Sequence, residues 1–241
     1  MSLKENLVNK NDRLIIGSLI LSFTYLFYFY DLPYIFILII FLFSLFELFK
    51  CGIFKNLSLL ILLLYLPLLL SIFLINSSNY SLLIFVLFIL INLILKKYIK
   101  EIFLFNFLLF FYFIFLIIND STVNIFHIIF IAFFNDTVAF IFGKIIKGPL
   151  IIPSVSPKKT WSGTLVSFVL SSILIIFFFD LYFIKAALIS ISLFFGDLYF
   201  SYIKRSINIK DFSNILKGHG GILDRIDSLF ICISLFYFFN I

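Results

Sequence analysis

The chain has 241 residues, of which 63% are hydrophobic and only 12% charged, and its formal net charge is +6. A mean hydropathy of +1.23 excludes a soluble globular protein. Repeated apolar runs, each near the ~20 residues that a membrane-spanning helix needs, indicate several spans. The runs lack the strict alternation of β-barrel strands, so we expect an all-α polytopic transmembrane helical bundle.

Apolar runs separated by polar breaks predict about nine spans. In chain order they cover residues 14–30, 33–49, 57–75, 80–95, 102–118, 122–142, 164–179, 182–202 and 226–239. Lysine and arginine accumulate on the cytoplasmic side of membrane proteins, which gives an independent check of this count. With the N-terminus inside, every lysine and arginine except Lys185 falls on the inner side. The sequence therefore predicts a cytoplasmic N-terminus.

Two predicted cytoplasmic loops, residues 143–163 and 203–225, are much longer than the other connections. Short turns need only reverse the chain, whereas long polar loops commonly carry function. We therefore divide the chain into N-terminal transmembrane helices, residues 1–134, and a C-terminal transmembrane region, residues 135–241, that carries the function.

The first polar segment begins with Asp136, near the inner end of the sixth predicted span. A carboxylate at that depth is costly unless it meets water, a cation or an amide, or reaches the interface. The segment continues with Ser156–Thr160, which reads SPKKT and precedes a helix that we expect to start near Thr160. Its lysines, hydroxyls and helix N-terminal amides suit a phosphate. Contact of the lysines with anionic lipid headgroups is the alternative.

The second polar segment begins on the eighth predicted helix. Asp197, Ser201, Lys204 and Arg205 are spaced i, i+4, i+7 and i+8, which places them along one face of that helix. Asp197 interrupts an apolar run and therefore needs a partner. A metal cation is one candidate, and an ion pair with Lys204 or Arg205 is the other.

A glycine-rich stretch, Gly218–Gly221, then precedes two more acids, Asp224 and Asp227. Such a flexible turn can bring backbone amides close to a phosphate chain. Either acid alone would only complement the dipole of the last helix. Together with Asp197 they place three carboxylates among several cations, and Mg²⁺ bridging an anionic substrate would relieve their mutual repulsion. The sequence has no G-x-x-x-x-G-K-[ST] segment, which excludes a P-loop nucleotide site.

These motifs resemble those of the phosphatidate cytidylyltransferase family, also called CDP-diacylglycerol synthases. The family's signature is Ser, two residues, Lys-Arg, four residues, Lys-Asp, a small residue two further on, and later His-Gly-Gly, two residues, Asp-Arg, one residue, Asp. It is met here by Ser201, Lys204, Arg205, Lys210, Asp211, Ser213, His219, Gly220, Gly221, Asp224, Arg225 and Asp227. The family's upstream elements resemble Asp136–Phe140 and Ser156–Gly163. Lys217, Ser162 and Phe140 depart from the usual residues.

The resemblance implies transfer of the cytidylyl group of CTP to phosphatidic acid, giving CDP-diacylglycerol and pyrophosphate. From the three carboxylates we expect Mg²⁺ as cofactor, held by Asp197, Asp224 and Asp227, and the sequence leaves an accompanying monovalent cation open. The implied catalytic residues are Ser201, Lys204, Arg205, Lys210, Asp211, His219 and Arg225. The implied substrate-binding residues are Asp136, Ser156, Lys158, Lys159, Thr160, Gly220 and Gly221.

We expect CTP, phosphatidic acid and membrane lipids as partners and no nucleic acid, and the sequence leaves a homodimer open. The protein is expected in the inner (plasma) membrane with its active site facing the cytoplasm, because the charge distribution puts both polar loops there.

A CTP-dependent polyprenol or lipid kinase would show similar phosphate chemistry. A transporter would use intramembrane acids as an ion path, but its acids should line several helices through the bilayer. An inactive homologue is the remaining alternative.

Overall fold

The computed structural model describes residues 18–54 apart from 20, residues 85–119 apart from 88 and 92, residues 124–216, and residues 220–239. The predicted span at 57–75, the signature residue His219 and the irregular Lys217 lie outside the described residues. Five of the described helices are long and apolar enough to cross a membrane. The protein is therefore an integral membrane protein built mainly from helices, as expected.

The described helices follow the predicted spans closely. In chain order they are α2 (Pro33–Lys50), α5 (Ile99–Asn119), α6 (Ile125–Ile146), α7 (Trp161–Phe179), α8 (Phe183–Ser206), α9 (Leu223–Ile226) and α10 (Leu229–Phe238), with a 3-10 turn at Lys96–Tyr98. Residues 21–29 and parts of 85–94 are also helical. The five spans that match α2 and α5 to α8 are thus confirmed as helices, and the total of about nine stays a prediction.

Local sequence signals set several of these helix ends. α2 has Pro33 in its first turn, where a missing backbone N–H costs nothing. The Asn124 side chain caps α6 by accepting a hydrogen bond from the N–H of Phe126. Thr160 caps α7 in the same way by accepting from the N–H of Gly163, so the predicted helix start near Thr160 is confirmed. That bond also occupies one of the amides expected to face a phosphate.

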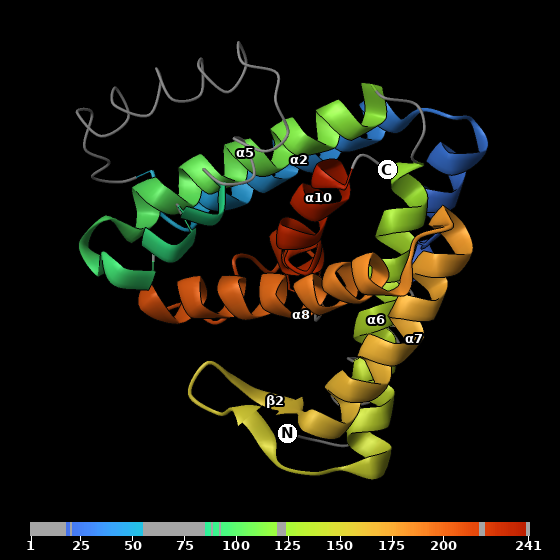
Figure 1. Ribbon diagram of the computed structural model, residues 1–241. Coiled ribbons are helices and arrows are strands. Elements are labelled where there is room, and N and C mark those ends of the chain that lie inside the picture. The colour runs from blue at the N-terminus through green and yellow to red at the C-terminus, as the bar shows by residue number, and fades with distance from the viewer. Residues whose placement is uncertain are drawn as a thin grey trace, which may run out of the picture.

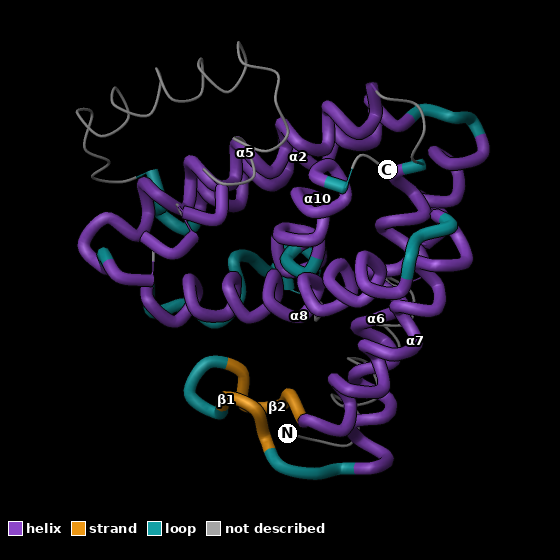
Figure 2. Tube along the Cα trace, viewed as in Figure 1, coloured by secondary structure: helices purple, strands orange, loops and turns teal. Residues whose placement is uncertain are grey.

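The loop expected at residues 143–163 contains a small β-hairpin, which the all-α prediction missed. Strands β1 (Leu150–Ile152) and β2 (Ser156–Thr160) are antiparallel, with Leu150 opposite Thr160 and Ile152 opposite Ser156. A strand of three residues is too short to give a periodic pattern in the sequence. Figure 2 shows the hairpin below α8, at the end of the α6 and α7 pair. The position of the hairpin determines which residues the lysines of β2 can contact.

The helices pack around α10. Figure 1 shows α6 and α7 side by side, α2 beside α5, and α10 between α5 and α8. An aromatic cluster fills the space among α5, α8 and α10. Ring centroids lie 5.2 Å apart for Phe103 and Phe200, 4.9 Å for Phe200 and Phe230, and 6.0 Å for Phe103 and Phe212. Such pairs contribute about 0.5–1.5 kcal/mol each beyond their burial. Because Phe212 follows α8, the cluster also anchors the start of the second polar segment.

Candidate active site

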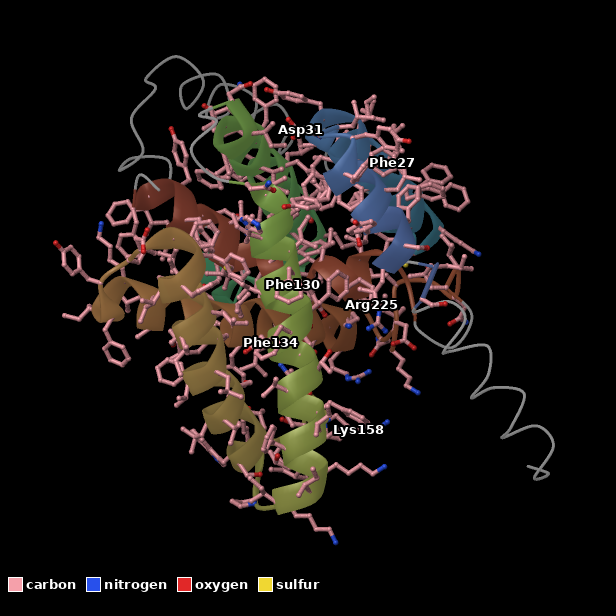
Figure 3. All side chains as sticks on the ribbon, turned by 90° about the vertical axis from the view of Figure 1, so that its right-hand side faces the viewer. Phe27, Asp31, Phe130, Phe134, Lys158 and Arg225 are labelled. Carbon is pink, nitrogen blue, oxygen red and sulfur yellow. The ribbon has the colours of Figure 1, made fainter. Side chains whose placement is uncertain are left out.

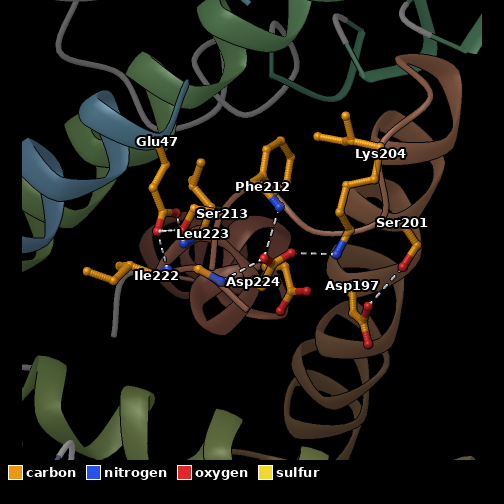
Figure 4. Close-up of polar contacts among 12 residues, drawn as sticks. Glu47, Asp197, Ser201, Lys204, Phe212, Ser213, Ile222, Leu223 and Asp224 are labelled. Atoms are coloured by element: carbon orange, nitrogen blue, oxygen red, sulfur yellow. Dashed lines mark hydrogen bonds and ion pairs between the residues drawn. The ribbon is translucent and has the colours of Figure 1, made fainter. Parts of the chain in front are cut away.

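Lys204 lies among the three predicted metal ligands. Its Nζ is 2.7 Å from Oδ1 of Asp224, and both side chains are largely buried, with exposures of 10% and 7%. The carboxylates of Asp227 and Asp197 also attract this ammonium group. The structure therefore brings the predicted acids and bases together near the end of α8. Figure 4 shows Lys204 reaching from α8 to Asp224, with Asp197 and Ser201 on the same helix.

The second oxygen of Asp224 organises the backbone around it. Oδ2 accepts hydrogen bonds from the N–H of Phe212, at 3.1 Å, and from the N–H of Gly221, at 2.9 Å. Gly220 reaches this turn with a positive φ of 78°. Charged acceptors make the stronger hydrogen bonds. Asp224 thus joins the turn after α8, the glycine-rich stretch and α9 into one unit while it pairs with Lys204.

Asp197 connects the two polar segments. Its Oδ1 accepts a hydrogen bond from Oγ of Ser201 at 3.3 Å, which confirms that the two share a helix face. Its Oδ2 forms an ion pair with Lys159 of β2, rather than with the expected alternatives Lys204 or Arg205. Lys159 also lies 5.0 Å from the centre of the Phe194 ring. The pairing differs from the alternative because the hairpin brings Lys159 over α8.

Asp136 and Asp227 complete the acidic cluster. The N–H of Ser228 donates to Oδ1 of Asp227 at 2.9 Å, and its Oγ donates to Oδ2 of Asp136 at 3.4 Å. Asp227 is buried, and the negative charges of Asp197 and Asp136 act on it. A Cβ added to Gly196 would lie 2.6 Å from the backbone oxygen of Asp227, so this glycine permits the close approach of α8. Asp136, a predicted substrate contact, therefore joins the predicted metal ligands.

The other predicted residues lie toward the edge of this cluster. Arg205 is exposed, and its guanidinium donates to the backbone oxygens of Val155 and Ile209. Lys210 and Asp211 are exposed in the turn after α8. On β2, Lys158 is exposed and Ser156 is half-buried. In the view of Figure 3, Lys158 and Arg225 lie on the same side of α6.

Glu47 of α2 also contacts the candidate site, although it belongs to none of the sequence motifs. Its side chain is fully buried, and it accepts hydrogen bonds from Oγ of Ser213 at 2.6 Å, the N–H of Ile222 at 2.8 Å and the N–H of Leu223 at 2.9 Å. The sequence does show that Glu47 is a single acid inside an apolar run, and an acid in such a run needs a partner. Figure 4 shows Glu47 reaching from α2 to this loop.

Cys51, just after α2, adds a further contact to the same loop. Burial, followed by the negative charge of Glu47, raises the pKa of its thiol to about 11. The thiol therefore stays protonated at neutral pH and donates to the backbone oxygen of Phe212. The turn after α8 and the residues just before Asp224 are thus both attached to the C-terminal end of α2.

The donor chemistry of the cluster fits the expected Mg²⁺, since carboxylate oxygens are the ligands this ion prefers. The negative charges of Asp197, Asp224 and Asp227 all act on one ammonium group, that of Lys204. Among the described residues, however, no three His, Cys, Asp or Glu side chains already form a ligand set for a metal ion. The metal assignment therefore stays a prediction that fits the residue types present.

A largely apolar cavity of about 670 Å³ adjoins the cluster. Its wall includes Phe36 and Ile40 of α2, Ile129 of α6, and Ile222 of the glycine-rich turn. Arg225 is also part of the wall. The positive charge of Arg225 also acts on Asp136, so this residue of the cavity wall is electrostatically linked to the acidic cluster. The site thus combines a charged group and an apolar space, which suits a ligand with a phosphate and hydrocarbon chains.

Comparison with known proteins agrees with this description. Three relatives that are named phosphatidate cytidylyltransferase illustrate the similarity. The protein from Rickettsia bellii is 39% identical over 120 residues, covering 44% of this chain and 52% of the relative. That from Rickettsia prowazekii is 40% identical over 121 residues, covering 44% and 53%. That from Helicobacter pylori is 43% identical over 105 residues, covering 39% and 38%.

The chain thus spans about half the length of the Rickettsia relatives it matches. A family model described as the cytidylyltransferase family covers far more of this chain, from residue 11 to residue 241. The match includes all the elements of the site, from Glu47 on α2 to Asp227 before α10. The chain belongs to the cytidylyltransferase family.

Proposed function

We propose that this protein transfers the cytidylyl group of CTP to phosphatidic acid, giving CDP-diacylglycerol and pyrophosphate. The observation that carries the proposal is the position of Arg225, which lines the apolar cavity and acts electrostatically on the acidic cluster. A diacyl lipid needs a hydrocarbon space beside a phosphate site. The relatives named phosphatidate cytidylyltransferase support the same reaction.

In this reaction an oxygen of the lipid phosphate attacks the α-phosphorus of CTP. A new P–O bond forms, the bond from the α-phosphorus to the bridging oxygen breaks, and pyrophosphate leaves with the electron pair. Lys204, Lys159 and Arg225 are the cations placed to neutralise phosphate oxygens while charge shifts to the leaving group. Without substrate, Lys204 is paired with Asp224 and Lys159 with Asp197.

Asp197, Asp224 and Asp227 are proposed to hold Mg²⁺. When bound, the ion would neutralise phosphate oxygens and support the charge of the leaving group. Because Asp224 and Asp197 are paired with Lys204 and Lys159, these lysines would exchange carboxylate partners for phosphate oxygens as substrate binds. Ser201 would keep Asp197 oriented through its hydrogen bond. Whether a monovalent cation joins the site is a matter for metal replacement assays.

We also propose that the chain crosses the inner (plasma) membrane about nine times, with a cytoplasmic N-terminus and a cytoplasmic active site. The inward position of every lysine and arginine except Lys185 supports this topology. Cysteine substitution tests it. A thiol at exposed position 158 should react with a membrane-impermeant maleimide only after inverted vesicles are made, whereas one at 185 should react in intact cells. The reverse pattern would refute the orientation.

Labelled CTP separates this function from its nearest rival. With purified protein and phosphatidic acid, label in the α-phosphate should enter the lipid. A CTP-dependent lipid kinase would instead transfer label from the γ-phosphate, and that result would overturn the proposal. A transporter is less well supported, because the acids of the cluster are paired with Lys159 and Lys204 in one place. A homodimer stays a prediction from the sequence.

A further inference from the structure

We propose that Glu47 is a positioning residue for cytidylyl transfer. It holds Ser213, Ile222 and Leu223 in the positions that present Asp224 to Lys204. This inference rests on the proposed function, because it concerns the rate of that reaction. It also extends the active site to α2, whose other residues are apolar apart from Tyr34, Ser44 and Lys50.

The first argument is that both oxygens of the Glu47 carboxylate accept hydrogen bonds from the loop. Oε1 accepts from the hydroxyl of Ser213 and the N–H of Ile222, and Oε2 accepts from the N–H of Leu223, at 2.6, 2.8 and 2.9 Å. A carboxylate accepts hydrogen bonds at both oxygens and offers no competing donor when ionised. The loop supplies only donors to it. The two partners are therefore chemically matched in a way that an amide side chain cannot reproduce.

The second argument is steric. A Cβ added to Gly221 would lie 2.6 Å from both oxygens of Glu47. Real Cβ atoms do not approach oxygen so closely, so the carboxylate occupies the space that glycine leaves free. The Glu47 side chain thus packs directly against Gly221. The glycine is needed for the carboxylate as much as for the turn itself.

The third argument connects this contact to the reacting groups. Three consecutive backbone N–H groups, those of Gly221, Ile222 and Leu223, are all bound by carboxylates. Asp224 binds the first of them, and Glu47 binds the other two. Leu223 directly precedes Asp224, which pairs with Lys204 at 2.7 Å. Any movement of Leu223 away from α2 would therefore move the carboxylate that balances Lys204.

Replacing Glu47 with a neutral residue tests whether Glu47 positions Asp224 for the reaction or only attaches the loop to α2. In Glu47→Gln, the side-chain NH₂ would face the N–H of Ile222 or of Leu223, so a donor would meet a donor. Ser44→Ala is the matched control, because Ser44 lies one helical turn away and is fully buried. Its hydroxyl has no hydrogen-bond partner among the described residues. Both variants change a buried polar group of α2, but only one touches the loop.

The experiment measures kcat and KM for CTP per folded molecule, with hydrogen exchange followed by mass spectrometry in the same detergent. We expect Glu47→Gln to lower kcat about tenfold or more, the loss of one hydrogen bond to a charged group, with KM for CTP changed less than about threefold. Exchange at Ile222 and Leu223 should become about tenfold faster, while α7 exchanges as before. Ser44→Ala should match the wild type in every measurement.

An unchanged kcat in Glu47→Gln, or a loss explained wholly by a smaller folded fraction, would overturn the proposal. If Glu47→Gln does not fold, Ser213→Ala removes one of the three bonds and keeps the charge. It should lower kcat about threefold to tenfold, and an unchanged kcat would count against the role of Glu47. Wild-type protein that transfers no cytidylyl group would refute the proposed function instead, while faster exchange in Glu47→Gln would still report on the contact.

Discussion

Lys159 of β2 pairs with Asp197 of α8, so a residue of the hairpin and a residue of a membrane helix form one ion pair. The two polar segments of the chain meet at this contact. The side chains of Lys159 and Asp197 keep exposures of 23% and 22%, which leaves both accessible to a ligand that arrives at the site. The hairpin therefore forms one side of the proposed phosphate site.

Removing the Lys159 ammonium should weaken nucleotide binding more than it slows the chemical step. We expect Lys159→Ala to raise KM for CTP about tenfold, the effect of one charge-assisted contact to phosphate. Steady-state kinetics with varied CTP measure this. Lys144→Ala is the control, because Lys144 is an exposed lysine near the end of α6. Equal kinetics for the two variants would show that Lys159 contributes only general positive charge.

Neutralising Asp224 should almost abolish turnover. In Asp224→Asn the ion pair with Lys204 is lost, and an amide NH₂ is placed among groups that were donating to a carboxylate. We expect kcat to fall about 100-fold or more while the helical content by circular dichroism is retained. Asp180→Asn is a matched control, because Asp180 is exposed with a φ of 50°, which asparagine tolerates. Activity near the wild-type level in Asp224→Asn would refute the role of this acid.

Adding a methyl group at Gly196 should separate α8 from the start of α10. The new Cβ would lie 2.6 Å from the backbone oxygen of Asp227 and 2.8 Å from that of Ser228. Forcing such an overlap typically costs about 1–3 kcal/mol. We therefore expect Gly196→Ala to lower Tm in detergent and to reduce activity, because Asp197 moves with the helix. Ile191→Ala, at an exposed position of the same helix, should do neither. A stable and active Gly196→Ala protein would contradict this packing.

Much of the fold was predictable because long apolar runs separated by polar breaks have one physical solution in a membrane. The predicted site residues Asp197, Ser201 and Lys204 share a helix face at fixed spacing, so their grouping was predictable as well. The short hairpin was not, since β1 has only three residues and no periodicity. Lys159 of this hairpin is the cation that pairs with Asp197, so that pairing was not predictable either.

Glu47 escaped prediction for a different reason. Its partners lie between 166 and 176 residues away in the chain, and nothing local to α2 specifies them. Glu47 lies in an apolar run, where burying a carboxylate is unfavourable. The sequence does not show which groups compensate for that burial. The pairing of Asp224 with two backbone amides was hidden similarly, because it depends on how the glycine-rich turn folds.

Filling the apolar cavity should impair use of the lipid and spare the nucleotide. Ile40 of α2 lines the cavity, so Ile40→Trp would occupy space that hydrocarbon chains need. We expect KM for phosphatidic acid to rise about tenfold in mixed micelles, as the loss of some 1–2 kcal/mol of apolar contact implies, with KM for CTP unchanged. Leu42→Trp is the control, because Leu42 is 56% exposed on α2. A short-chain phosphatidic acid should suffer less from Ile40→Trp than a long-chain one, since fewer of its carbons reach the filled region. Equal effects on both lipids, or a rise in KM for CTP instead, would place the acyl chains elsewhere.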